Sequence, residues 1–542
     1  MSPLPPVKVS SYAWRQRNDS PSSWERRALA GENVWMHTAS EHQQLYLQAT
    51  LSAQLSIQHH IFAAKAKRAW RQLRSEVPEL VLTPDYGGDE TNGTGLLRYH
   101  DAHDELDISR WLDRTFLTAA GTRARAGSGH EALRDEIVQL KGEDWPGEYQ
   151  GCVWVQTAGE ADEVKNVEVL LNINHLITDG IGIRILLDKY LALLAEQLNP
   201  DHESKDDLLH WKSSAHNLSA PWIEFMNEDQ VTSGPEYEAG LIRNQDVMMN
   251  QMSKNWGFPL HNPVPAPTSA SPSPDAEKQR YHCHTLSALE TTSLLTSIKQ
   301  SISPAATVTH LIHAAAILAL LHLHPFPVAP KDEERSTTLY SPCWLNGRRY
   351  LSLSPTSHPS GRRETYIPIC QSFHPIVIPD LNLLSERVTS ATTGAAKREL
   401  LISTCKHIQQ EYQKLKERKG VLSEGVSLME DVGRRLHRFV WRQFYSSVSF
   451  VFGPLSFFLL SDQMKAQQQQ PPKPTGPDPN PDAQAEAEAT PRVADPYILS
   501  DGLFSTYLRP SYTYTTADAR VSRTVFTITA VDFTATTSGP NL

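Results

Sequence analysis

One stretch decides the fold of this chain: residues 167–195, VEVLLNINHLITDGIGIRILLDKYLALLA. In its first part, every second residue is apolar from residue 167 to residue 173, and this period of two predicts a strand. His175 continues the apolar phase where the strand ends. We therefore expect the histidine side chain to point toward the interior of the protein.

A tight turn and a helix are expected after the histidine. Asp179 suits the N-cap position of such a helix, because its carboxylate can accept backbone hydrogen bonds. The residues that follow place an apolar stripe on one face of the helix. The stripe consists of Ile181, Ile185, Leu186, Leu193 and Leu194. The stretch is thus predicted to form a strand, a turn and an amphipathic helix.

Three kinds of site could use such a junction. A dinucleotide-binding fingerprint needs three glycines, but only Gly180 and Gly182 fit, and Ile185 stands at the third place. A metal site would need His175 and Asp179 on one helical face together with a third ligand, which the nearby sequence does not offer. The third kind uses a single interior histidine as a general base. An imidazole with a reference pKa of about 6.5 can take a proton from a hydroxyl or an amine near neutral pH.

The composition excludes several classes of protein. Of the 542 residues, 39% are hydrophobic and 21% are charged, so the chain can build large cores and is predicted to be globular and soluble. Its 51 basic and 61 acidic residues give a net charge of −10, which argues against a nucleic-acid partner. Five scattered cysteines without a CxxC pair indicate a reducing compartment and no structural zinc.

The sequence also predicts where the protein resides. Its first residues show no secretory signal, because no apolar segment follows a basic start. The richest apolar runs are shorter than the roughly 20 residues that a membrane helix needs. We therefore expect a cytoplasmic protein without a membrane segment.

Two proline-rich segments predict the domain organisation. Residues 259–275, PLHNPVPAPTSASPSPD, are predicted to be a linker between an N-terminal lobe, residues 1–258, and a C-terminal lobe, residues 276–542. Residues 467–491, QQQQPPKPTGPDPNPDAQAEAEATP, have no large apolar side chain. They are predicted to form a disordered insertion inside the C-terminal lobe.

Both predicted lobes mix helical and strand patterns. Residues 44–74 carry apolar residues at helical spacing and are predicted to form one or two amphipathic helices. In the C-terminal lobe we expect helices at residues 286–300 and 307–323 and strands at residues 338–343 and 522–531. The expected fold class is therefore α/β or α+β.

Residues 175–180, HLITDG, have the pattern HxxxDG. They resemble the motif of the acyltransferase superfamily that includes chloramphenicol acetyltransferase, the plant alcohol acyltransferases and the condensation domains of peptide synthetases. The preceding strand and the following helix suit that superfamily. Segments of both halves also resemble the fungal trichothecene 15-O-acetyltransferase group, namely LYLQATL at 45–51, WRQLRSEVPEL at 70–80 and LNGRRYL at 345–351.

The resemblance implies two chloramphenicol-acetyltransferase-like lobes with a central tunnel and His175 at its centre. His175 would remove the proton of an acceptor hydroxyl as its oxygen attacks the carbonyl of an acyl thioester, without a covalent acyl-enzyme. The resemblance also implies that Asp179 is structural and pairs with an arginine, for which Arg348 is the candidate. Gly180 would leave room beside the active site. The C-terminal half has no DFGWG segment, which argues against the architecture of the plant enzymes.

The implied function is an acyl-CoA-dependent O-acyltransferase, with acetyl as the expected acyl group and a hydroxyl of a secondary metabolite as acceptor. Acyl-CoA would be a co-substrate, and we expect no bound cofactor, no metal and a monomer. Two alternatives stay open: a condensation-like enzyme that takes its acyl group from a carrier-protein thioester, and an inactive binding protein of the same fold.

Each candidate residue also has a purely structural interpretation. An inward histidine such as His175 is often a core residue without a catalytic role, since buried polar groups usually form hydrogen bonds. Asp179 alone would be a helix cap. Arg348 alone would be a solvated surface arginine. The DG pair and the helix that follows it favour the catalytic interpretation of His175.

Overall fold

The structure is a computed structural model. The described residues are 8–36, 44–85, 95–120, 150–158, 162–200, 211–251, 258–259, 288–326, 336–352, 365–444, 493–494, 511–515 and 522–535. The predicted linker beyond residue 259 and the predicted insertion at 467–491 lie outside the described residues. Their assignments stay predictions.

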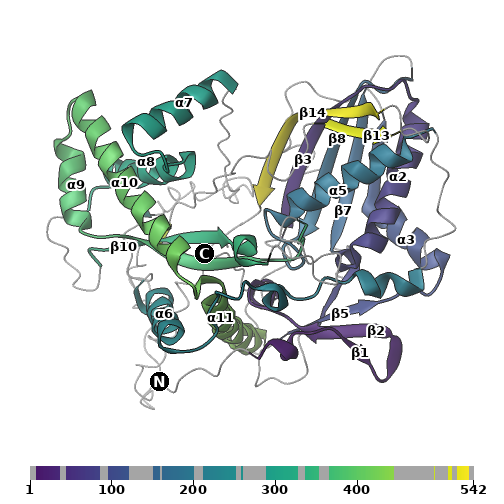
Figure 1. Ribbon diagram of the computed structural model, residues 1–542, viewed down its shortest axis with the longest axis horizontal. Helices are drawn as coiled ribbons and strands as arrows, with labels where there is room; N and C mark the ends of the chain where they lie inside the picture. The colour runs from purple at the N-terminus through teal and green to yellow at the C-terminus, as the bar shows by residue number, and fades with distance from the viewer. Residues whose placement is uncertain are drawn as a thin grey trace, which may run out of the picture.

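A six-stranded sheet is the centre of the N-terminal half (Figure 1). Its strand order is β13-β14-β3-β8-β7-β6, and neighbours run antiparallel except for the parallel pair β6 and β7. The strands are β3 (Gln44–Ala53), β6 (Phe116–Ala120), β7 (Gly151–Ala158), β8 (Asn166–Asn174), β13 (Ser511–Thr515) and β14 (Ser522–Ala535). The HxxxDG turn thus follows a central strand.

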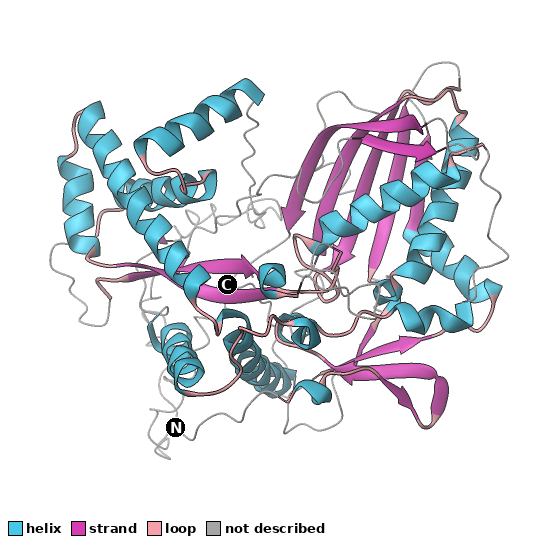
Figure 2. Cartoon of the chain, viewed as in Figure 1, coloured by secondary structure: helices cyan, strands magenta, loops and turns pink. Residues whose placement is uncertain are grey.

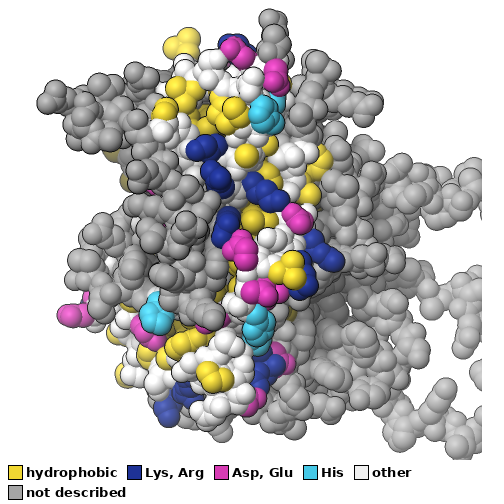
Figure 3. Space-filling model, turned by 90° about the vertical axis from the view of Figure 1, so that its right-hand side faces the viewer, with side chains coloured by type: hydrophobic (Ala, Val, Ile, Leu, Met, Phe, Trp, Pro, Cys, Tyr) yellow, Lys and Arg dark blue, Asp and Glu magenta, His cyan; other side chains and the backbone are white. Residues whose placement is uncertain are grey.

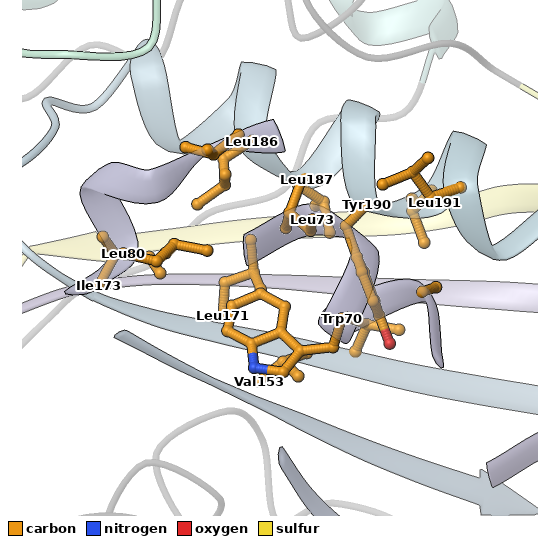
Figure 4. Close-up of a cluster of buried hydrophobic side chains, with 14 of the residues drawn as sticks. Trp70, Leu73, Leu80, Val153, Leu171, Ile173, Leu186, Leu187, Tyr190 and Leu191 are labelled. Carbon is orange, nitrogen blue, oxygen red and sulfur yellow. The ribbon is translucent and has the colours of Figure 1, made fainter. Parts of the chain in front are cut away.

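Two helices, α2 (His59–Glu76) and α5 (Gly182–Gln197), pack on one face of this sheet and on each other (Figure 1). Their apolar side chains interlock with those of the strands in the cluster drawn in Figure 4. Its labelled members are Trp70, Leu73, Leu80, Val153, Leu171, Ile173, Leu186, Leu187, Tyr190 and Leu191. Burial of one such large side chain contributes about 1.5–3 kcal/mol, so this core fixes the start of α5 against the end of β8.

A smaller antiparallel sheet lies at the edge of the N-terminal half (Figure 1). Its order is β1-β2-β5-β4, with β1 (Arg15–Arg17), β2 (Ser20–Arg27), β4 (Thr83–Asp85) and β5 (Leu96–His100). The short helix α1 (Gly31–Met36) comes directly after β2, and α3 (Glu105–Thr115) follows β5.

Helices surround a two-stranded antiparallel ribbon of β10 (Leu339–Asn346) and β11 (Gln371–Ile378) (Figure 2), and all of them except α6 (Pro235–Asp246) come from the C-terminal half of the chain. The others are α7 (Ala288–Ser301), α8 (Val308–Leu323), α9 (Leu381–Ser390), α10 (Gly394–Glu417) and α11 (Val421–Phe444). Their buried apolar side chains form a second core cluster. The 3-10 turn η10 (Gly347–Tyr350) ends the first strand of the ribbon.

The remaining elements are short. They are η1 (Val9–Ser11), η3 (Pro78–Val81), η5 (Trp211–Asn217), η6 (Trp222–Phe225), η7 (Val247–Gln251), β9 (Phe258–Pro259) and β12 (Val493–Ala494). Strands β9 and β12 pair with each other, although they are far apart in the sequence.

The mixed fold class is confirmed, and most predicted elements are present. The expected helices at 286–300 and 307–323 correspond to α7 and α8. The expected strand at 338–343 overlaps β10, and the one at 522–531 lies within β14.

The prediction of helix for the whole of residues 44–74 is wrong, because residues 44–53 form β3 and the helix begins at His59. Leu45, Leu47, Ala49 and Leu51 are all buried, at a period of two. A spacing of four residues between apolar positions fits both a strand and a helix, so it cannot separate the two.

Strands from both halves of the chain share one sheet. β14 lies next to β3, with Phe533 opposite Leu47, and β13 continues the sheet beyond it. Both strands lie within the predicted C-terminal lobe, residues 276–542, yet they pair in the sheet of the N-terminal half. The lobe boundaries themselves stay a prediction.

Acidic and basic side chains are interleaved on the face shown in Figure 3. Two ion pairs join α2 and α3, namely Lys67 with Asp113 and Arg71 with Glu105, each at 2.8 Å. Such a mixture produces no extended field of one sign. Among the described helices, none combines the length and the apolar character that a membrane crossing requires.

Candidate active site

The HxxxDG residues form the turn between β8 and α5, as the sequence predicts. β8 ends at Asn174, whose side-chain oxygen accepts a hydrogen bond from the N–H of Leu176 at 2.8 Å. Asp179 Oδ1 accepts from the N–H groups of Ile181 at 3.1 Å and Gly182 at 2.8 Å. The carboxylate thereby satisfies free N–H groups at the start of α5, although the residue that directly precedes the helix is Ile181.

Asp179 is also paired with an arginine of the C-terminal half. Arg348 Nη1 lies 2.9 Å from both carboxylate oxygens, and the side chains of both residues are almost completely buried. The backbone N–H of Cys370 donates to Asp179 Oδ2 at 2.8 Å. The contact between Asp179 and Arg348 that the sequence analysis expected is therefore present in the structure.

The rest of the Arg348 guanidinium is bound by backbone carbonyls. Nε donates to the carbonyl of Tyr366 at 2.7 Å, and Nη2 donates to those of Ile367 at 3.2 Å and Pro368 at 2.9 Å. The side chain of Asn346, at the end of β10, accepts from the N–H of Arg348 at 3.1 Å and caps η10. Arg348 thus joins the segment before β11 to the histidine turn.

These contacts keep the Asp179 carboxylate ionised. Burial alone would raise its pKa, but the charge and hydrogen bonds of Arg348, with the N–H groups of Cys370 and Gly182, lower the pKa below its usual value. Both oxygens already accept hydrogen bonds from several donors. The carboxylate is therefore suited to hold the turn and not to take a proton from a substrate.

His175 is only partly exposed, and its ring stacks on the indole of Trp35 with the ring centroids 4.0 Å apart and an angle of 16° between the planes. Burial lowers the pKa of His175, whereas the charge of Asp179 and the backbone of His175 and Thr178 act in the opposite direction and are outweighed. Its Nδ1 atom is buried and has no hydrogen-bond partner of normal geometry among the described residues. A lowered pKa favours the neutral form of the ring, which is the form that a general base needs.

Gly182 is a site residue whose structural importance the sequence analysis missed. A Cβ atom at this position would lie 2.0 Å from the carbonyl oxygen of Ile367 and 2.1 Å from Thr178 Oγ1. The Thr178 hydroxyl itself donates to that carbonyl at 2.7 Å. The histidine turn therefore touches the segment before β11 where only a glycine fits. The one signal in the sequence was a second glycine two residues after the DG pair.

We expect Gly182→Ala to destabilise the protein by about 1–3 kcal/mol, because the added methyl group forces apart two backbone segments that are in contact. Gly394→Ala is the matched control, since a Cβ atom at Gly394 meets nothing within 4 Å. Urea unfolding of both variants measures the difference. Equal stability of the two variants would contradict the close contact.

Gly180, Arg184 and Arg349 make other contacts near the histidine turn. The carbonyl of Gly180 accepts a hydrogen bond from Arg184 Nη1. The guanidinium of Arg349 lies over the ring of Tyr350, 5.6 Å from its centroid. That Gly180 leaves room for a substrate stays a prediction.

Among the described residues, no three His, Cys, Asp or Glu side chains are grouped as a metal ion would require.

A histidine turn between a strand and a helix of a mixed α/β fold, followed by an aspartate that pairs with a distant arginine, is typical of the HxxxDG acyltransferase class. The chain belongs to the 15-O-acetyltransferase Tri3 family, whose sequence model matches residues 4–433. The matched region contains His175, Asp179 and Arg348.

Individual relatives are distant. The trichothecene O-acetyltransferase TRI3 of Trichoderma arundinaceum is 24% identical over 396 residues, which cover 70% of this chain and 70% of the relative. The trichothecene 15-O-acetyltransferase TRI3 of Fusarium sporotrichioides is 26% identical over 275 residues, which are 50% of this chain and 46% of the relative. The solved structure of TRI3 from F. sporotrichioides has a TM-score of 0.69 at 18% identity, covering 100% of this chain and 91% of that one, and so shares the fold.

Proposed function

We propose that the protein is an acyl-CoA-dependent O-acetyltransferase that acetylates a hydroxyl group of a secondary metabolite, with His175 as the general base. The observation that carries this proposal is a partly exposed imidazole directly after β8, on a turn whose aspartate is already bound by Arg348 and by backbone N–H groups. Membership in a family of acetyltransferases supports the reaction type.

In this proposal the reaction takes place in one displacement. The acceptor hydroxyl gives its proton to the His175 ring while its oxygen forms a bond to the thioester carbonyl carbon. The tetrahedral intermediate then collapses, the C–S bond breaks, and the imidazolium returns the proton to the leaving thiolate of CoA. His175 ends as it began, and no acyl group is ever bound to the protein.

The proposal includes the two-lobed arrangement with a central tunnel. The turn that carries His175 belongs to the N-terminal half, and the segment that anchors it, through Arg348 and Cys370, belongs to the C-terminal half. An acyl thioester would approach His175 from one side of this junction and the acceptor from the other. Asp179 and Arg348 would keep the junction rigid, as structural residues of the site.

The first acceptor to test is a trichothecene alcohol, because the names of both relatives state that class of acceptor. Full-length protein would be mixed with acetyl-CoA and the alcohol, and we expect release of free CoA together with an acceptor heavier by one acetyl group. A parallel reaction with the same acyl group on a phosphopantetheine carrier protein tests the other donor.

The outcomes separate the candidate functions. Turnover with acetyl-CoA supports the proposal. Turnover with the carrier-bound thioester alone would replace it with the condensation-like alternative. Binding of acetyl-CoA and acceptor without any product would favour the inactive binding protein.

A further inference from the structure

The short helix α1 places Trp35 directly against His175. The two rings are nearly parallel, with centroids 4.0 Å apart, and Trp35 is 7% exposed. Trp35 precedes His175 by 140 residues, and the two residues come from different elements of the fold. This contact therefore depends on how α1 is held.

Buried polar contacts anchor α1. Arg26 at the end of β2 makes two hydrogen bonds to Glu32, at 2.7 Å and 2.6 Å, and both side chains are almost completely buried. Glu32 also accepts from the N–H of Leu29 at 2.8 Å. Asn33 accepts from the N–H of Gly95 at 3.0 Å, which ties the helix to the start of β5. A helix of only six residues thus has a fixed position.

The same segment of the C-terminal half supports both rings. A Cβ atom at Gly31, the first residue of α1, would lie 3.0 Å from the side chain of Ile369. The residues on either side of Ile369 hold the histidine turn, because Ile367 accepts from Thr178 and Cys370 donates to Asp179. The start of α1 and the histidine turn therefore lie against neighbouring residues of one segment.

A general base usually has a second group that orients its ring, most often an acceptor for the other ring nitrogen. For His175 Nδ1, no hydrogen bond of normal geometry is present among the described residues, and the backbone of His175 and Thr178 supplies the polar groups that act on the ring. Asp179 is not available for this task, since its carboxylate binds Arg348 and three backbone N–H groups. The flat contact with Trp35 is therefore a further restraint on a ring whose second torsion angle is otherwise broad.

We propose that Trp35 is a positioning residue for His175, whose indole fixes the plane of the imidazole ring and excludes water from one of its faces. The inference deepens the proposed function and rests on it as far as turnover is concerned. The stacking itself is a property of the structure.

The charges around the two rings are paired. Asp179 acts on His175 and is neutralised by Arg348, and Glu32 of α1 is neutralised by Arg26. Removing the indole therefore changes the solvation of His175 more than the charge around it. Burial lowers the pKa of His175, so opening one ring face to water should raise that pKa toward its ordinary value of 6.5.

The first test compares Trp35→Ala and Trp35→Phe. We expect kcat of the alanine variant to fall about 10- to 100-fold, with the KM for acetyl-CoA changed less than about twofold, because a loose ring is misplaced while substrate binding remains. The acidic limb of the kcat/KM profile should move to higher pH. The phenylalanine variant still presents a flat ring, so its kcat and the position of its acidic limb should be close to those of the unchanged protein.

Trp111→Phe is the matched control, because this indole also stacks on a ring, that of Trp70 at 5.6 Å, but in the core between α2 and α3. It should leave the acidic limb unchanged. If Trp35→Ala does not fold, Trp35→Leu fills the volume without a flat ring and takes its place. An acidic limb that stays where it is, or moves to lower pH, would overturn the proposal.

The second test needs no turnover. Diethyl pyrocarbonate acylates neutral imidazoles, and peptide mass analysis reports its rate of reaction with His175 at each pH. We expect His175 of Trp35→Ala to be modified faster than in the unchanged protein. The pH at which its modification rate is half maximal should also be higher. Equal rates and midpoints would contradict the role of Trp35. If the unchanged protein transferred no acyl group to any acceptor, the proposed function would fail, while this test of Trp35 would still give an answer.

Discussion

Replacing His175 with alanine is expected to lower kcat by about 10²- to 10⁴-fold, the usual contribution of a general base. The neutral imidazole is the proton acceptor of the proposed reaction, and Asp179 cannot replace it because Arg348 and backbone N–H groups occupy its carboxylate. Initial rates of CoA release with saturating acceptor measure the loss. Thermal melting should show that the fold is kept.

The pH dependence of the unchanged protein gives an independent check of the same role. The base works only when it is neutral, so kcat/KM should fall as the pH drops through the pKa of His175. Burial lowers that pKa below 6.5, so activity should persist to a pH below this value. A loss of less than about tenfold in His175→Ala, with acceptor affinity unchanged, would argue against His175 as the base.

Local sequence patterns predicted the part of the site that lies within residues 167–195. The strand, the turn and the helix of residues 167–195 form β8, the HxxxDG turn and α5, because the period-two pattern, the carboxylate at the turn and the apolar stripe all act within a few residues. Arg348 was found only through the resemblance of its segment to known enzymes. Its contact with Asp179 spans 169 residues, which no local pattern encodes.

The parts that could not be predicted depend on contacts between distant segments. Trp35 faces His175 through a contact between α1 and the turn after β8, and neither segment carries a pattern that indicates the other. Gly182 is required because of the carbonyl of Ile367, far along the chain. The placement of β14 beside β3 is likewise a long-range pairing. For β3 itself, apolar residues four apart suited a helix as well as a strand.

Asp179→Asn and Arg348→Met are each expected to destabilise the protein by about 3–5 kcal/mol, because removing one partner leaves the other as an unpaired buried charge. Both variants should also lose turnover, since the turn that directs His175 loses its anchor. Urea unfolding and initial rates measure the two effects. The exposed pair of Lys67 and Asp113 is the matched control, with an expected effect of about 0–1 kcal/mol for Lys67→Met.

The double variant Asp179→Asn/Arg348→Met is expected to be less damaged than the sum of the single variants. With both charges gone, no unpaired ion remains in the interior, and residues in contact typically couple by about 0.5–3 kcal/mol. The backbone donors of Ile181 and Gly182 can still bond to the asparagine oxygen, so part of the turn should survive. Strictly additive losses would contradict a direct contact between Asp179 and Arg348, and Arg184 or Arg349 would then be the next arginine to test.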